Sequence, residues 1–538
     1  MSRYYLGVDV GTGSARAGVF DRTGNLFGSG KHDISLSREP GEIVEQSSDE
    51  IWRAVGASVR HAMAEAAINP ASVAGIGFDA TCSLVVLGPG GRPLPVGPSG
   101  DPNRNVIVWM DHRALEQAAR INASRHRVLD YVGGSISPEM ETPKLLWLLE
   151  HRPETFANAW QFMDLADYLT WRATGALARS TCTVTCKWTY LAHENRWDAS
   201  YFHAVGLGQL ADEGFARIGT DIRGPGSPIG RLSRDAAADL GLPPDIPVAA
   251  SLIDAHAGAI GTVGAKGGPG SIATRMAYVV GTSACTLASA TIPNFVPGVW
   301  GPYHSALLPD LWLLEGGQSA AGAAIDHLVT MHPAALEAAR AGLGSGAWLS
   351  ERIAQRTAPH LSDAVDLAAG VHVVPDFLGN RSPFADPHAR AIVAGLTLDT
   401  SIASLESLYV AGLTGIGYGC RQIVEAMRGK GLDIDTIMVS GGAAASPLVR
   451  QLLADSTGLS VAGSASPEPV LLGSAILGAV AAGDFENLKA AMGAMSSVGA
   501  SHLPAPGEIE LRHAQRFAAF VELQSVERRL RGRSPVLV

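Results

Sequence analysis

Short apolar runs alternate along this chain with longer stretches in which apolar residues recur every three or four positions. Runs of strand length occur at 4–10, 73–78 and 437–439, and helical spacing occurs at 48–67 and 405–427. Strands that alternate with helices in this way are typical of sheets covered by helices. The pattern therefore predicts an α/β fold.

Other segments are predicted from residue type. β-branched and aromatic residues at 181–191 predict a strand. The spacing at 162–171 predicts an amphipathic helix, with Asp164 and Asp167 capping it or facing solvent. The long helix at 405–427 carries three glycines that helix propensity does not favour, which predicts close packing against a sheet or a ligand: Gly415, Gly417 and Gly419.

The first strand ends in a tight polar turn before a returning strand at 15–20. Glycine lets a backbone approach a ligand closely, and turn N–H groups with hydroxyls make an anion site. The turn residues are Gly11, Thr12, Gly13 and Ser14. Asp9 would repel a phosphate unless a cation lay between them, so the turn suggests a magnesium nucleotide. The alternative is an ordinary hairpin with Asp9 satisfied by backbone amides.

The same pattern returns in the second half of the chain. A strand at 277–280 meets a turn at Gly281, Thr282 and Ser283, and another strand returns. This second turn lacks a carboxylate. The repetition predicts a duplicated fold in which two phosphate-binding turns face each other across a cleft. A third glycine turn, Gly441 and Gly442, enters a helix and suits a nucleotide phosphate.

Polar residues also follow strands where ligands meet the chain in open α/β folds. Asp79 and Thr81 come after one strand, and Asp111, His112 and Arg113 come after another. Carboxylates accept from hydroxyls and arginine donates, so these residues suit a polyhydroxylated ligand. The alternatives are a capping turn for the first group and a helix N-terminus, capped by Asp111, for the second.

Asp254 interrupts an apolar, small-residue run before Gly261. A buried carboxylate without partners is costly, so Asp254 either has partners or faces a cleft. The alternative is a simple cap of the helix that follows.

Composition narrows the class of protein. The 538 residues carry a net charge of −10, which argues against nucleic acid or an anionic membrane as the main partner. Five cysteines are odd in number and scattered, so we expect no disulfide framework. Cys182 and Cys186 have a metal-type spacing but no second pair nearby, which disfavours a metal there. The start resembles no signal peptide, and we expect a cytoplasmic protein.

Taken in order, these segments resemble the FGGY carbohydrate kinase family, over residues 4 to about 483. The resemblance lies in an ordered set of motifs: Asp9-Val-Gly-Thr-Gly-Ser14, Trp109-Met-Asp-His-Arg113, Lys144-Leu-Leu-Trp147, Asp254, Gly281-Thr-Ser283 and Gly441-Gly442 before Ser446-Pro447. Residues 77–85 and 110–114 look like those of pentulose kinases that act on D-ribulose.

The resemblance implies two ribonuclease H-like domains of the actin and hexokinase type with a ligand cleft between them. We expect a sugar-binding domain at 1–265 and an ATP-binding domain at 266–538, with a peripheral helical tail from about 496. The implied partners are a small sugar and ATP with Mg²⁺, and a homodimer is an option.

The resemblance also implies roles for residues. Asp254 would be the general base, with a low pKa because it begins a helix. Asp9 would hold Mg²⁺ through water. The sugar would contact Asp79, Thr81, Asp111, His112, Arg113 and Asp254, and the nucleotide would contact the three glycine turns. The alternatives are phosphorylation of ribitol, L-ribulose or D-xylulose, and a non-catalytic ATP-binding module on the same fold.

Overall fold

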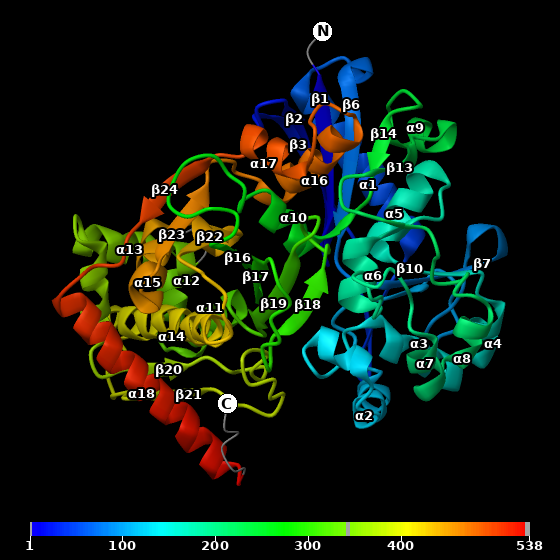
Figure 1. The fold of residues 1–538 in the computed structure, drawn as a ribbon. Coiled ribbons are helices and arrows are strands. Elements are labelled where there is room, and N and C mark those ends of the chain that lie inside the picture. The colour runs from blue at the N-terminus through cyan, green and yellow to red at the C-terminus, as the bar shows by residue number, and fades with distance from the viewer. Residues whose placement is uncertain (1–2, 341–344, 533–538) are drawn as a thin grey trace.

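The computed structural model describes residues 3–340 and 345–532. Two mixed β-sheets, each covered by helices, form the two halves seen in Figure 1. The sheet of the N-terminal half runs, in spatial order, β13 (Pro228–Arg231), β14 (Pro247–Ala249), β6 (Val73–Ala80), β1 (Tyr4–Val10), β2 (Ser14–Asp21) and β3 (Leu26–Asp33). β15 (Leu252–Ile253) pairs with β6 beside this path.

The sheet of the C-terminal half repeats this plan. Its order is β18 (Trp300–His304), β19 (Trp312–Gln318), β17 (Ala284–Ala290), β16 (Arg275–Val280), β22 (Thr436–Ser440), β23 (Ser460–Ser464) and β24 (Val498–His502). In both halves an antiparallel hairpin, β1–β2 or β16–β17, is followed by a parallel partner, β6 or β22. The predicted duplicated α/β fold is therefore confirmed by the topology.

A second sheet extends the N-terminal half. It contains β10 (Gln161–Asp164), β7 (Leu84–Gly88), β9 (Val106–Ile107), β5 (Ile43–Gln46) and β4 (Ser37–Glu39), with β8 (Arg92–Pro93) on β7. The helices α2 (Leu115–Ala123), α3 (Glu141–His151) and α4 (Pro153–Asn158) follow these strands in the chain. The remaining helices of this half include α5 (Leu165–Thr174), α7 (Ala199–Ala204), α8 (Gly208–Asp212) and α9 (Arg234–Leu240).

Three predicted segments differ from the structure. The tail expected to be peripheral and helical from about 496 begins with β24, which pairs with β23 in the C-terminal sheet. Residues 181–187 form the helix α6 (Thr181–Lys187) instead of a strand, because Ser180 caps it and its buried packing overrides β-propensity. Residues 161–164 form β10, and the helix α5 starts only at Leu165. Asp164 caps that helix as expected, but Asp167 is buried and accepts from the Ser180 amide.

The helix α16 (Pro469–Ala481) returns from the C-terminal half to pack on the N-terminal sheet (Figure 1). Glycines make the contact possible. A Cβ added to Gly77 would lie 1.9 Å from the carbonyl oxygen of Ser474, and one added to Gly7 would lie 2.0 Å from that of Leu471. The helix α10 (Asp254–Ile260) packs against α16, so this helix pair lies where the halves meet.

The other helices cover the C-terminal sheet. They include α11 (Gly322–Met331), α12 (Ala335–Ala339), α13 (Ser345–Thr357), α14 (Ile402–Arg428) and α15 (Pro447–Thr457). The helix α17 (Leu488–Met495) instead packs against α16, next to the N-terminal half (Figure 1). The predicted close packing on α14 is confirmed: a Cβ on Gly415 would lie 2.3 Å from the Val373 carbonyl oxygen, and one on Gly419 would lie 2.4 Å from Gln318 Nε2.

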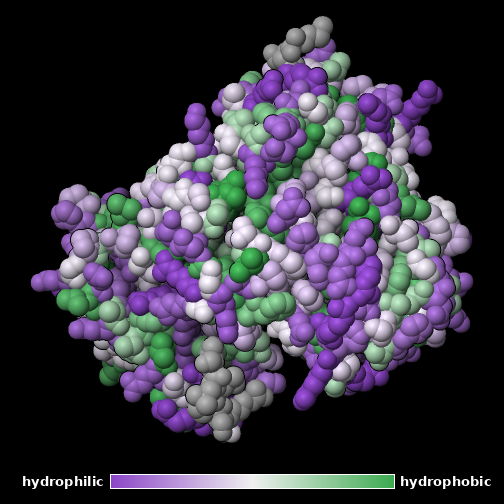
Figure 2. Space-filling view, in the orientation of Figure 1, coloured by the Kyte–Doolittle hydropathy of each residue, from purple (hydrophilic) through white to green (hydrophobic). Residues whose placement is uncertain are grey.

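The last helix, α18 (Glu508–Leu530), runs along the outside of the C-terminal half (Figure 1). Its inner side is nevertheless buried, since Phe520 packs with Val374 and Tyr418. On the face shown in Figure 2, hydrophilic residues are widespread and apolar residues gather mainly near the centre. In the parts of the chain that the structure describes, no helix has both the length and the apolar character needed to cross a membrane.

Candidate active site

A cavity of about 990 Å³ lies between the two halves, with lining residues from both sheets. The three predicted turns all reach it. Gly11, Thr12, Gly13 and Ser14 come from the β1–β2 hairpin, and Gly281, Thr282 and Ser283 come from the matching β16–β17 hairpin, while Gly441 and Gly442 follow β22. The structure thus brings all nine predicted nucleotide-binding residues to one cavity.

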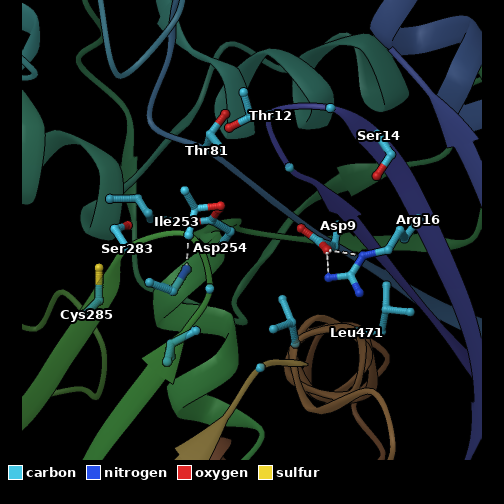
Figure 3. A pocket seen from close by; sticks show the side chains of 18 of the residues that line it. Asp9, Thr12, Ser14, Arg16, Thr81, Ile253, Asp254, Ser283, Cys285 and Leu471 are labelled. Carbon is cyan, nitrogen blue, oxygen red and sulfur yellow. Dashed lines mark hydrogen bonds and ion pairs between the residues drawn. The ribbon is translucent and has the colours of Figure 1, made fainter. Parts of the chain in front are cut away.

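Asp9 is the last but one residue of β1 and lines the cavity beside the first turn (Figure 3). Its carboxylate accepts a hydrogen bond of 2.8 Å from Arg16 Nε on β2. Arg16 also reaches Glu468 at 3.0 Å, just before α16. Oxygen ligands suit Mg²⁺, which usually binds through one or two carboxylates and substrate phosphates. Asp9 therefore fits the predicted magnesium site.

Asp254 is the first residue of α10 and faces the cavity opposite Asp9 (Figure 3). One carboxylate oxygen accepts from the Ala255 amide at 2.7 Å. Burial, and next the negative charge of Asp9, raise the pKa of Asp254 to about 6. The low pKa expected from the helix start is therefore wrong, because desolvation and Asp9 outweigh the helix dipole.

Charged residues of the cavity wall gather around the ring of Trp300. Lys187 Nζ lies 4.5 Å from the ring centroid and 3.2 Å from a Glu315 carboxylate oxygen. Arg381 lies over the same ring at 5.4 Å and 3.4 Å from Glu139. All five line the cavity. They form a polar pocket with two cations, two carboxylates and an aromatic face, which suits a ligand rich in hydroxyl groups.

These pocket residues were missed by the sequence reasoning, although one had a readable signal. Lys187 interrupts a buried run, Cys-Thr-Val-Thr-Cys-Lys-Trp, as Asp254 interrupts its own. The same argument about buried charge would have identified it. Glu139, Glu315 and Arg381 come from distant parts of the chain, and only the fold brings them together.

Four residues predicted to contact the sugar do not line the cavity. Asp111 and Arg113 form a buried ion pair at 2.7 Å, and Asp111 also accepts from the Val44 amide at 2.6 Å. Arg113 further binds Glu45 at 2.9 Å. These contacts occupy both side chains inside the wall of the N-terminal half, which explains why they turn away from the cavity.

His112 and Asp79 each contact or neighbour a residue that lines the cavity. His112 Nε2 is 3.8 Å from a carboxylate oxygen of Glu139, and this carboxylate is the main cause that raises the pKa of His112. Asp79 is fully buried on β6, in register with Asp9 on β1, and accepts from Ser474 Oγ on α16. Burial, and next the charge of Asp9, raise the pKa of Asp79 well above its usual value. Thr81, in contrast, does line the cavity.

A second cavity of about 460 Å³ adjoins the first, since Val280 and Gly442 line both. It is mostly apolar and lies between the helices of the C-terminal half. Its walls include Tyr278, Gly322, Ile325, Ser350, Tyr409, Leu413 and Leu453. A flat heteroaromatic group with a few polar edges fits such walls.

Comparison with known proteins agrees with this arrangement. Residues 4–261 match the N-terminal domain of the FGGY family of carbohydrate kinases, and residues 276–482 match its C-terminal domain. An FGGY carbohydrate kinase domain-containing protein of Xenopus laevis is 43% identical over 97% of this chain and 96% of its own. A D-ribulokinase of Saccharomyces cerevisiae is 38% identical over 90% of this chain and 73% of its own.

Solved structures share the fold. The crystal structure of a xylulose kinase from Rhodospirillum rubrum matches with a TM-score of 0.77 at 21% identity, and the match covers 99% of this chain and 100% of that one. The two-sheet architecture, the paired turns and both domain matches lead to one conclusion. The chain belongs to the FGGY family of carbohydrate kinases and is an ATP-dependent sugar kinase.

Proposed function

We propose that this kinase phosphorylates the terminal hydroxyl of a pentulose, and that the pentulose is D-ribulose, which becomes D-ribulose 5-phosphate. The observation that carries the proposal is that Asp254 lines the same cavity as the two phosphate-type turns and the charged residues around Trp300. The likeness to the yeast D-ribulokinase supports the choice of sugar.

In this proposal the sugar lies against Trp300, with its hydroxyls bound by Lys187, Glu315, Glu139 and Arg381. Thr81 and Asp254 contact its reacting end. Asp79, Asp111 and Arg113 support the wall rather than touch the sugar, because their side chains are held by Ser474, the Val44 amide and Glu45. His112 acts through Glu139.

The nucleotide is placed from the other side. Its adenine would occupy the apolar second cavity, and its phosphates would pass Gly441 and Gly442 to reach the two hairpin turns. Backbone N–H groups and the hydroxyls of Thr12, Ser14, Thr282 and Ser283 would donate to phosphate oxygens. Mg²⁺ held by Asp9 through water would neutralise charge on the transferred phosphoryl group.

The chemistry assigned to this chain is proton transfer and positioning. Asp254 accepts the proton of the terminal hydroxyl as that oxygen forms its bond to the γ-phosphorus and the bond to ADP breaks. A pKa of about 6 leaves Asp254 ionised at neutral pH. This pKa is also close to neutral pH, which is where a general base works best. Exclusion of water by the surrounding walls limits wasteful ATP hydrolysis.

We place the boundary between the sugar-binding and ATP-binding domains near residue 265, between β15 and β16. The whole protein is expected to work in the cytoplasm, where ATP is available and its five free thiols stay reduced.

The test is ADP release measured with a panel of ketopentoses and pentitols. D-ribulose should give the highest kcat/KM, and Asp254→Asn should lower kcat by about 10²- to 10⁴-fold while both substrates still bind. The exposed Asp235→Asn on α9 is the matched control and should behave as the wild type. Preference for ribitol, L-ribulose or D-xylulose would overturn the choice of sugar, and no stimulation by any sugar in the panel would overturn the pentulose assignment.

A further inference from the structure

A row of buried charged and polar groups extends from the sugar end of the cavity into the core. Lys187 and Glu315 line the cavity. Glu315 Oε2 is 3.4 Å from His256 Nε2, and His256 Nδ1 is 3.0 Å from Cys182 Sγ. His256 and Cys182 are each 0% exposed and do not line the cavity. The row therefore connects Lys187 and Glu315, which are proposed to bind the sugar, to two side chains that no substrate can touch.

His256 also connects the two halves of the molecule. It lies on α10, two residues after Asp254, whereas Glu315 lies on β19 of the C-terminal sheet. Cys182 lies on α6, which ends at Lys187. One imidazole is thus held between a helix of the N-terminal half and a strand of the C-terminal half, next to the proposed base.

Attraction between neighbouring charged side chains stabilises the row. Burial disfavours the imidazolium, but Cys182 and Glu315 raise the pKa of His256 to about 10. Burial likewise opposes the Glu315 carboxylate, but Lys187 and His256 lower its pKa to about 2. With a charged ring, Nδ1–H donates to the sulfur and Nε2–H donates to the carboxylate. Each buried charge therefore has a neighbour of opposite sign or a hydrogen-bond acceptor.

Cys186 lies close to this row, so a bound metal ion is the alternative explanation for why two cysteines and a histidine cluster here. The ligand atoms of Cys182, Cys186 and His256 lie within 4.8 Å of one another. Structural zinc sites, however, use four protein ligands, and this group among the described residues has three. The second nitrogen of His256 already faces a carboxylate, and a hydrogen-bonded row satisfies both nitrogens without a metal.

We propose that His256 is a positioning residue for sugar recognition: clamped at Nδ1 by Cys182, it donates Nε2–H to Glu315 and holds that carboxylate, with Lys187, in the orientation that binds the sugar hydroxyls. This inference rests on the proposed pentulose kinase activity. It assigns His256 no contact with either substrate.

Two substitutions of His256 distinguish the role of Nε2 from that of Nδ1. The amide nitrogen of His256→Gln reaches about as far as Nε2 and can still donate to Glu315, whereas that of His256→Asn reaches only as far as Nδ1. We expect His256→Asn to raise the KM and the Kd of the sugar about tenfold, as the loss of one hydrogen bond to a charged group does. His256→Gln should stay within about threefold of the wild type, and the KM of ATP should not change in either variant.

The matched control is His513→Asn, since His513 is also buried and bonded through Nδ1, to Tyr418, but lies on α18. It should leave the sugar KM unchanged. Equal sugar affinity in the Asn and Gln variants of His256 would overturn the proposal. The proposal would also be overturned if His256→Asn weakened ATP binding as much as sugar binding and lowered the melting temperature as well.

Two further measurements do not depend on turnover. Metal analysis of the purified protein should find no stoichiometric zinc; one zinc per chain that is lost in Cys182→Ala, but not in the control Cys420→Ala, would overturn the proposal. ¹⁵N-histidine NMR should show the His256 signal, identified by its absence in His256→Gln, shift when Glu315 is changed to Gln. An unchanged signal would overturn the inference, whereas a wild-type protein that binds no pentulose but shows this shift would refute only the proposed substrate.

Discussion

The proposed base, Asp254, makes the reaction sensitive to pH in a range that can be measured. Burial and the charge of Asp9 raise its pKa to about 6. Because only the ionised form accepts a proton, kcat/KM for the sugar should be level above about pH 7 and should fall tenfold per unit well below about pH 6. Steady-state assays between about pH 5 and 8 check this.

Stability must be controlled in that experiment. Enzyme held at the lowest pH and assayed at neutral pH should regain full activity, which separates protonation from unfolding. A profile that stays level down to about pH 5 would contradict a raised pKa and would favour the low value expected of a carboxylate at a helix start.

A second carboxyl, Asp79, should make stability depend on pH in the opposite sense to a carboxylate whose pKa is lowered by an ion pair. Its folded pKa lies well above the usual value of 3.8, so the folded protein binds a proton that the unfolded chain releases. Stability contributed by this group therefore falls as pH rises above about 4. Asp79→Asn is neutral at every pH and has nearly the same shape, so it should gain stability relative to the wild type as pH rises.

The measurement is the difference in melting temperature between Asp79→Asn and the wild type at about pH 5 and about pH 8. The difference should be more positive at the higher pH. The exposed Asp235→Asn serves as the control and should show no such trend. A difference that stays constant or reverses would mean that Asp79 is ionised in the folded protein.

At the scale of elements, the contact between α16 and the N-terminal sheet depends on glycine. A Cβ on Gly77 would lie 1.9 Å from the Ser474 carbonyl oxygen, which belongs to the helix backbone and cannot move aside cheaply. Gly77→Ala should therefore cost about 1–3 kcal/mol of folding free energy. Urea unfolding of the variant measures this.

A matched glycine gives the comparison. An added Cβ on Gly224 meets nothing within 4 Å, so Gly224→Ala should be close to neutral. Equal effects of the two substitutions would show that loss of backbone freedom, rather than the contact with α16, governs the response.

The elements also show why some features were predictable. Both hairpins and their turns were predicted because strand, glycine turn and returning strand are adjacent in sequence and depend on local preferences. The segment 181–191 was predicted wrongly as a strand, because its β-branched residues favour one in isolation while tertiary burial and the Ser180 cap favour α6. Local rules do not contain that information.

The charged pocket shows the same limit. Asp254 could be identified from its apolar surroundings in the sequence. Glu139, Glu315 and Arg381 could not be grouped, because residues 139, 315 and 381 meet only after two sheets have packed. Asp111 and Arg113 have hydrogen-bonding groups that suit a sugar. In the structure these groups bind each other and Glu45 inside the wall, so they are not available to a ligand in the cavity.

At the scale of the whole molecule, the nucleotide's phosphates and the sugar should bind cooperatively. The cavity takes Thr12 from one sheet and Thr282 from the other, and α10 and α16 lie where the halves meet. A triphosphate that contacts both turns favours an arrangement in which the two halves are close together. The same arrangement brings Lys187 of the N-terminal half and Glu315 of the C-terminal half into contact with the sugar. Two ligands that stabilise one closed arrangement must increase each other's affinity.

We therefore expect a non-hydrolysable ATP analogue with Mg²⁺ to lower the Kd of the sugar by about 5- to 150-fold, and the sugar to lower the Kd of the analogue by the same factor. Isothermal titration calorimetry measures both. Adenosine is the matched ligand control: it can fill the apolar second cavity but lacks the phosphates that reach the two turns, so it should leave sugar affinity unchanged. Equal coupling with adenosine would place the link in the adenine pocket, and no coupling with the analogue would mean that the halves bind their ligands independently.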